Sequence, residues 1–137
     1  MLIDSNIIIY SINKNSPKNL QAIKFLEEDT TYYFSHQTIL ESLRILTHPK
    51  FDYKEDGNKV LTQVYKIANS GIIINPTNLT INLFKQLIER YKLKANKIFD
   101  AYFVATALSN GIDVIATDNE RHFKKFKEIQ VYNPFKQ

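Results

Sequence analysis

The chain has 137 residues, a net charge of +4 and no cysteine, with 44% hydrophobic and 23% charged residues. This size fits one compact domain, and the ordinary composition and short apolar runs argue against disorder and against a membrane span. The lack of cysteine excludes disulfides, thiolate metal sites and cysteine nucleophiles, and without a basic leader at the amino terminus we expect a cytoplasmic protein.

Short apolar runs alternate with segments in which apolar residues recur every three or four positions. The runs predict buried strands and the periodic segments predict helices. The predicted strands are 1–4, 30–34, 72–76, 113–117 and 128–132, and the predicted helices are 5–13, 16–29, 35–49, 59–70, 79–93, one around 98–108 and 119–126. The helix at 16–29 is expected to begin with Ser16 as its cap and Pro17 in its first turn. This alternation predicts an α/β fold with a mostly parallel central sheet, in one domain over residues 1–137.

Four acidic residues fall at positions where an α/β sheet can build a functional site. Asp4 ends the first predicted strand and Asp118 follows the strand "VIAT", so both are expected at the carboxyl edge of the sheet. Glu41 and Asp100 lie inside otherwise apolar helix segments. Taken singly, each acid has an ordinary explanation: the aspartates as helix caps or partners of a helix N-terminus, and Glu41 as an ion-pair partner of Arg44.

Together, the four carboxylates indicate a cation site. Burying several anionic side chains near one another is costly, so such a cluster persists only when some are protonated or a cation neutralises them. Ligands that are all Asp and Glu oxygens select hard divalent ions, and Mg²⁺ in particular is held by a few carboxylates together with water and substrate phosphate. The pattern therefore favours a site that acts on phosphate esters.

The four acids stand in motifs that resemble the acidic motifs of PIN-domain ribonucleases. These motifs are "MLIDSNIIIY" with its D-x-N, "ILESLRILTHP" with its glutamate, "KIFDAYFVATAL" with its aspartate and "VIATDNERHF" with its T-D. Their order and spacing are most similar to the VapC-type toxins of type II toxin-antitoxin pairs, and the resemblance covers essentially the whole chain. It implies a PIN-like three-layer α/β/α sandwich with a mostly parallel central sheet.

The resemblance also implies a function and roles for individual residues. The implied metal ligands, which would also be the catalytic residues, are Asp4, Glu41, Asp100 and Asp118. Asn6 and Thr117 would orient those carboxylates. The implied protein is an endoribonuclease dependent on Mg²⁺ or Mn²⁺, which hydrolyses RNA to leave a 5′-phosphate and a 3′-hydroxyl. As a toxin it would be silenced by a cognate antitoxin, and it would form a homodimer.

Basic residues near the acids are candidates for holding RNA. An acidic metal site repels the phosphate backbone, so an RNA-cleaving site also needs cations on its rim. The candidates, each within about a turn of one of the acids, are Arg44, Lys97 and Arg121. A solvated helix face is the alternative explanation for each of them. The three histidines, His36, His48 and His122, are expected to be capping or surface groups.

Three other functions stay open at this point. One is a housekeeping PIN nuclease for RNA maturation, and another is a catalytically inactive PIN-like RNA-binding protein, which the complete set of four acids disfavours. The third is a phosphoaspartate receiver-like domain, which also gathers aspartates at strand ends. A receiver needs a lysine beside its aspartate, and no such lysine partner is evident for the T-D strand.

Overall fold

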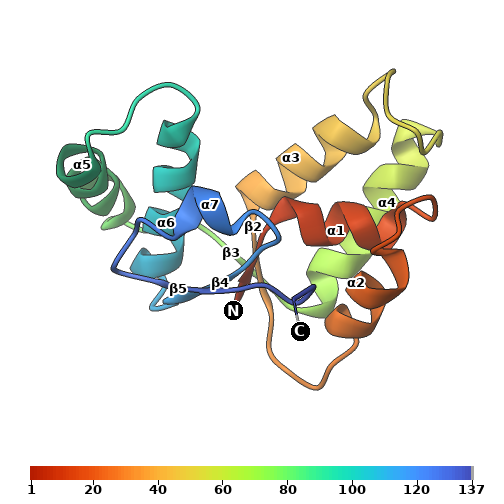
Figure 1. Ribbon diagram of the computed structural model, residues 1–137, viewed down its shortest axis with the longest axis horizontal. Coiled ribbons are helices and arrows are strands. Elements are labelled where there is room, and N and C mark those ends of the chain that lie inside the picture. The colour runs from red at the N-terminus through yellow and green to blue at the C-terminus, as the bar shows by residue number, and fades with distance from the viewer. Residues whose placement is uncertain (137) are drawn as a thin grey trace.

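A five-stranded sheet lies between two layers of helices in the computed structural model, which describes residues 1–136 (Figure 1). All neighbouring strands run parallel, in the order β3-β2-β1-β4-β5. The strands are β1 (Leu2–Ile3), β2 (Tyr33–Ser35), β3 (Ile72–Ile74), β4 (Val114–Ala116) and β5 (Gln130–Tyr132). The predicted α/β fold with a parallel central sheet is confirmed. The expected domain runs to Gln137, and that last residue lies outside the described range.

Each predicted helix is present, with ends that differ by a few residues. The helices are α1 (Ser5–Ile12), α2 (Asn19–Leu26), α3 (His36–Leu46), α4 (Gly57–Ser70), α5 (Thr80–Tyr91), α6 (Lys97–Ser109) and α7 (Glu120–Phe123). The expected start of α2 at Ser16 and Pro17 is wrong. Ser16 instead begins a turn. Its carbonyl accepts the amide of Asn19, and its hydroxyl accepts the amide of Lys18. None of the helices within residues 1–136 is long and apolar enough to span a bilayer.

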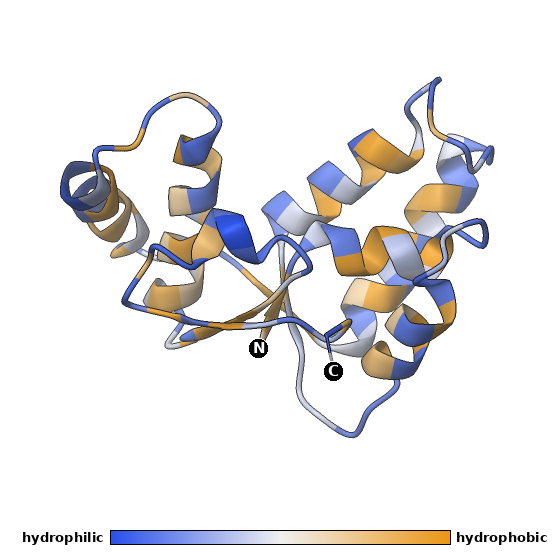
Figure 2. Cartoon of the chain, viewed as in Figure 1, coloured by the Kyte–Doolittle hydropathy of each residue, from blue (hydrophilic) through white to orange (hydrophobic). Residues whose placement is uncertain are grey.

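Each face of the sheet has its own apolar core. Leu2 and Ile115 point to the layer formed by α5, α6 and α7, whereas their neighbours Ile3 and Ala116 point to the layer formed by α1 to α4. Strands that are buried on both faces read as continuous apolar runs rather than as alternating patterns. In Figure 2 the apolar colour accordingly lies along the strands and on the helices, while the connecting loops are mostly hydrophilic.

The strand order reverses between β1 and β4. From β1 the chain proceeds to β2 and β3 on one side, and then crosses to β4 and β5 on the other. In open parallel sheets, ligands bind outside the carboxyl ends of the strands at such a switch point. The amide of Asp4 donates to the carbonyl of Ala116 at 3.0 Å, so the two strand ends meet there. Receiver-like sheets have the order 2-1-3-4-5, so the receiver-like alternative is wrong.

Gly71, directly after α4, is required by a close contact with β2. A Cβ at this position would lie 2.4 Å from the carbonyl oxygen of Tyr32 and 2.7 Å from Cε2 of Phe34, a buried ring. We expect Gly71→Ala to lower the free energy of unfolding by about 1–3 kcal/mol, because backbone and a packed core ring must shift to make room. Chemical denaturation measures this difference.

Gly57, in the first turn of α4, offers a matched control. A Cβ there would meet only Cγ2 of Thr47, at 4.0 Å. We expect Gly57→Ala to leave the free energy of unfolding unchanged or to raise it slightly, because alanine favours helices more than glycine does. Unchanged stability in Gly71→Ala would contradict the close contact.

Candidate functional site

Three of the four predicted acids lie together at the carboxyl edge of the sheet, and we call Asp4, Glu41 and Asp100 the acidic trio. Asp4 caps α1 directly after β1, and Glu41 lies in α3, which begins directly after β2. Asp100 lies in the first turn of α6, which precedes β4 and therefore runs back along the sheet. The charge of Glu41 adds to the rise in the pKa of both aspartates, so the three carboxylates lie within electrostatic reach of one another.

The acidic trio is only partly neutralised by cations of the chain. Burial raises the pKa of Asp4 to about 6, and the charges of Glu41 and Asp100 add to this rise, while hydrogen bonds from Thr117 and Ser5 oppose it. Burial likewise raises the pKa of Asp100, while the charges of His122 and Lys125 oppose this rise. Within residues 1–136, no cation forms an ion pair with Asp4. A partly buried acid beside other acids resists ionisation until a cation is supplied.

Asn6 and Thr117 contact the carboxylate of Asp4. The hydroxyl of Thr117 donates to Oδ2 of Asp4 at 2.7 Å, and the side-chain amide of Asn6 lies 3.4 Å from the same oxygen. Oδ1 of Asp4 accepts the amide of Ser5 at 2.8 Å, which is a helix-cap bond. Asp4 therefore caps α1 and also belongs to the acidic trio, and bonds to both of its oxygens hold the carboxylate in one orientation.

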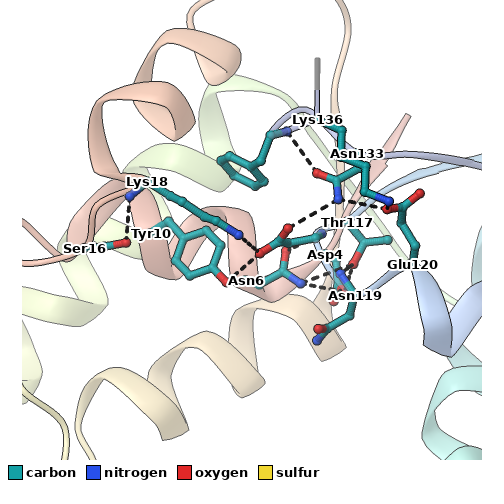
Figure 3. Close-up of polar contacts among 12 residues, drawn as sticks. Asp4, Asn6, Tyr10, Ser16, Lys18, Thr117, Asn119, Glu120, Asn133 and Lys136 are labelled. Carbon is teal, nitrogen blue, oxygen red and sulfur yellow. Dashed lines mark hydrogen bonds and ion pairs between the residues drawn. The ribbon is translucent and has the colours of Figure 1, made fainter.

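Asp118 is held by different partners from the other three acids. Its Oδ2 accepts the hydroxyl of Tyr10 at 2.8 Å and pairs with the ammonium of Lys18, and its Oδ1 accepts the amide of Asn133 at 3.3 Å (Figure 3). Burial acts to raise the pKa of Asp118, but the hydrogen bonds from Lys18, Tyr10 and Asn133 together outweigh it and lower the pKa. Burial, with the bond to Asp118, raises the pKa of Tyr10 to about 12, so its hydroxyl stays protonated and donates.

The helix-cap alternative for Asp118 is not what the structure shows. Within residues 1–136 its side chain accepts no amide of the following helix, and the hydroxyl of Thr117 instead accepts the amide of Asn119 at the entrance to α7. The contact of Asp118 with Lys18, 100 residues away, was not predicted from the sequence. A pair so distant in the sequence leaves no local motif. The one signal is the spacing of Asn6 and Tyr10, which puts them on the same face of α1.

His122 is a further member of the site that the sequence did not reveal. Its side chain is half exposed, as expected of a surface histidine, but its Nδ1 lies 3.3 Å from Oδ2 of Asp100. The contact arises because α7 packs against α6. His122 thus supplies the acidic trio with a hydrogen-bonding and titratable neighbour.

The three predicted basic residues are all exposed, and they do not lie in one place. Arg44 lines a hollow of about 170 Å³ together with Ile45, His48, Lys50 and Phe51, and within residues 1–136 it forms no ion pair with Glu41. Arg121 lines a pocket of about 390 Å³ beside Asp118. Lys97 is the first residue of α6, one turn before Asp100. Of the three, Arg121 is the one that shares a pocket with one of the predicted acids.

The donor set suits a hard divalent cation, although the side chains do not form a finished site. Oxygen ligands from Asp and Glu are what Mg²⁺ binds in proteins, and the partly buried Asp4 carboxylate forms no ion pair within residues 1–136. Among residues 1–136, however, no three Asp, Glu or His side chains stand close enough to hold one ion as they are placed. The acidic trio would have to close around an ion, and Asp118 would have to leave Lys18 to join it.

The fold and the acids define an α/β protein with an acidic site at the switch point of a parallel sheet. The family model of the PIN domain matches residues 1–129, and the chain belongs to this family. The predicted family resemblance is therefore confirmed. A comparison with curated proteins finds no match.

Several solved structures with a similar fold are of toxins or toxin-antitoxin complexes. A chain of VapBC-1 from nontypeable Haemophilus influenzae superposes with a TM-score of 0.70 and 18% identity, covering 98% of each chain. A toxin-antitoxin complex from Klebsiella pneumoniae gives 0.68 and 20%, over 99% of this chain and 98% of that one. VapC20 of Mycobacterium tuberculosis, a sarcin-ricin loop cleaving toxin, gives 0.63 and 15%, over 94% and 98%. At these identities the likeness establishes the fold.

Proposed function

We propose that this PIN domain is an endoribonuclease that depends on Mg²⁺ or Mn²⁺. The observation that carries the proposal is the acidic trio, in which the partly buried Asp4 has a raised pKa and no ion-pair partner within residues 1–136. Proteins of the PIN and VapC families are generally nucleases, and VapC20, which shares this fold, cleaves the sarcin-ricin loop. The proposed catalytic and metal-binding residues are Asp4, Glu41, Asp100 and Asp118.

Each group of residues has a proposed task. A bound Mg²⁺ or Mn²⁺ would supply the activation of water and the stabilisation of charge on the leaving 3′ oxygen. Asn6 and Thr117 keep the Asp4 carboxylate in one orientation through the bonds at its Oδ2. The exposed cations Arg121, which lines the pocket beside Asp118, and Lys97, one turn before Asp100, bind RNA phosphates. Arg44, in its separate hollow, binds the RNA strand further from the cleaved phosphodiester bond.

Cleavage of a defined pool of RNA tests this function. We expect cleavage that requires Mg²⁺ or Mn²⁺, stops with chelator, and leaves a 5′-phosphate and a 3′-hydroxyl at mapped cut sites. Cleavage that continues unchanged in chelator would contradict the metal-dependent mechanism. Binding of RNA without cleavage under every metal condition would favour an inactive RNA-binding protein instead.

We further propose that the nuclease is a toxin that a cognate antitoxin covers. The chains of similar fold include members of toxin-antitoxin complexes. Two large apolar side chains, Leu40 at 68% and Phe99 at 64% exposure, stand next in sequence to Glu41 and Asp100. The side chain of Gln37 donates to the carbonyl of Phe99 at 3.0 Å, which joins these two helix starts. A partner that buries this apolar rim would also close off the acids.

Expression in cells tests the toxin role. We expect growth to stop when the chain is produced alone and to resume when the product of the neighbouring gene is produced with it. Normal growth together with active RNA cleavage would favour a housekeeping nuclease. A homodimer and a cytoplasmic location remain predictions, which light scattering and cell fractionation can test.

A further inference from the structure

Lys18 is held at the edge of the site by two aromatic rings. Its Nζ lies 5.4 Å from the centroid of the Tyr10 ring and 5.2 Å from that of Phe135, and the two rings meet edge-on at 5.3 Å. The side chain is 38% exposed. Cation-π contacts of this kind favour one position of an otherwise flexible ammonium group. The rings come from α1 and from the segment after β5, so the tertiary fold creates this seat.

The ammonium of Lys18 faces the pocket of about 390 Å³ beside Asp118. The charged residues that line this pocket are Lys18, Asp118, Glu120, Arg121, Lys124 and Lys136. Glu120 is paired with Lys124 and Lys136, which leaves Lys18 as the ion-pair partner of Asp118. Four cations thus face two carboxylates, and the pocket carries a net positive charge although Asp118 lines it. A phosphate group of an RNA strand suits such a pocket.

Asp118 does not depend on Lys18 for its position. Tyr10 donates to the same carboxylate oxygen as Lys18 does, and Asn133 donates to the other oxygen. In Figure 3 Tyr10 and Lys18 lie next to each other, and Asn133 lies across from them. The lysine therefore contributes charge at this point rather than geometry. A divalent ion bound at Asp118 would neutralise this carboxylate in place of the ammonium.

We propose that Lys18 is an exchangeable cation, which neutralises Asp118 until a divalent ion takes that carboxylate and then binds an RNA phosphate in the pocket. The inference rests on the proposed function. In the exchange, Asp118 trades an ammonium for the divalent ion, and Lys18 trades a carboxylate for a phosphate. Neither charge is left unpaired in a partly buried site, which would be costly. The Tyr10 and Phe135 rings keep the ammonium at the pocket throughout.

The variant Lys18→Met tests the exchange, because it removes the charge and keeps an unbranched stem between the rings. Two measurements use the full chain: Mn²⁺ binding by titration calorimetry without RNA, and binding of labelled single-stranded RNA at saturating Ca²⁺ over a range of salt concentrations. A gel run afterwards confirms that the RNA is intact.

We expect Lys18→Met to bind Mn²⁺ about 5-fold more tightly than the wild type, or better, since no ammonium has to be displaced. RNA should bind more weakly, with a salt slope smaller by about 0.7. Lys18→Arg should keep the slope of the wild type.

Lys124→Met is the matched control, because it removes a charge from the same pocket but pairs with Glu120 rather than with Asp118. Its Mn²⁺ affinity should stay within about twofold of the wild type, since salt screens the more distant charge. Weaker Mn²⁺ binding in Lys18→Met would overturn the inference. It would mean that the Lys18–Asp118 ion pair only holds Asp118 in position. An unchanged RNA salt slope would also overturn it. If Lys18→Met shows both expected effects while the wild-type chain cleaves no RNA, only the proposed function would be contradicted.

Discussion

Replacing Asp100 by Asn is expected to lower the rate of RNA cleavage by at least about 100-fold, because removing even a group that only orients a metal ligand costs about 10- to 100-fold. The substitution keeps the size of the side chain and removes its charge. The one ion pair that Asp100 forms among residues 1–136 is with the half-exposed His122, so the variant should keep the fold. Cleavage of a labelled RNA with Mg²⁺ measures the rate, and circular dichroism checks the fold.

Asp29→Asn is the control for this substitution. Asp29 is exposed and lies in the loop before β2, at the amino-terminal edge of the sheet, opposite the acidic trio. Asp29→Asn removes the same charge from the chain as Asp100→Asn does, so any effect of net charge on RNA binding appears in both variants. We expect its cleavage rate to match that of the wild type. A folded Asp100→Asn protein that cleaves RNA at nearly the normal rate would show that the site is assigned wrongly.

Without divalent metal, the protein is expected to become less stable as the pH rises from about 5 to 8. The pKa of Asp4 is 3.8 in the unfolded chain and about 6 in the folded one. A carboxyl group with a raised folded pKa contributes stability at low pH that is lost as the pH rises through the folded value. Asp4 thereby contributes about 3 kcal/mol to the free energy of unfolding at low pH, of which roughly 1.5 kcal/mol is lost between pH 5 and 8. The pKa of Asp100 is shifted in the same direction.

Asp4→Asn should remove most of this pH dependence. Asparagine caps helices as well as aspartate does, so the bond to the amide of Ser5 can remain while the titrating charge is lost. Denaturation in chelator at several pH values compares the variant with the wild type and with Asp29→Asn. Wild-type stability that rises steadily over this pH range, or an equal fall in Asp4→Asn, would contradict the proposed electrostatics.

Metal should reverse the loss of stability in the wild type. A ligand that binds only the folded state stabilises it by about 2.7 kcal/mol when present at 100 times its dissociation constant. We therefore expect Mn²⁺ to stabilise the wild type more at pH 8 than at pH 5, since protonated Asp4 cannot bind the ion. Asp4→Asn should gain much less stability from Mn²⁺ than the wild type does. This ties the stability of the fold to the proposed chemistry, because the same carboxylates destabilise the metal-free protein and bind the ion.

Fold and acidic residues could be predicted from the sequence for a shared physical reason. Both faces of each central strand are buried, so strands such as "VIAT" read as apolar runs, and each run ends where an acid or a helix cap begins. The carboxyl edge of a parallel sheet collects whatever follows its strands, which brings Asp4 and Asp118 to one edge. Local patterns thus determined the fold class, the element order and the four candidate acids.

Contacts between distant segments were decided only by the tertiary structure. The pairing of Lys18 with Asp118 spans 100 residues, and His122 meets Asp100 only because two helices pack together. The start of α2 also depended on such context, since a turn at Ser16 leaves Lys18 free to reach the site. A side chain's charge is visible in the sequence, but its partner is set by distances that close only when the sheet and its two helical layers have assembled. The sequence therefore determined which carboxylates could form the site. The tertiary structure decided that a lysine pairs with Asp118 and a histidine with Asp100, while Asp4 has no ion-pair partner within residues 1–136.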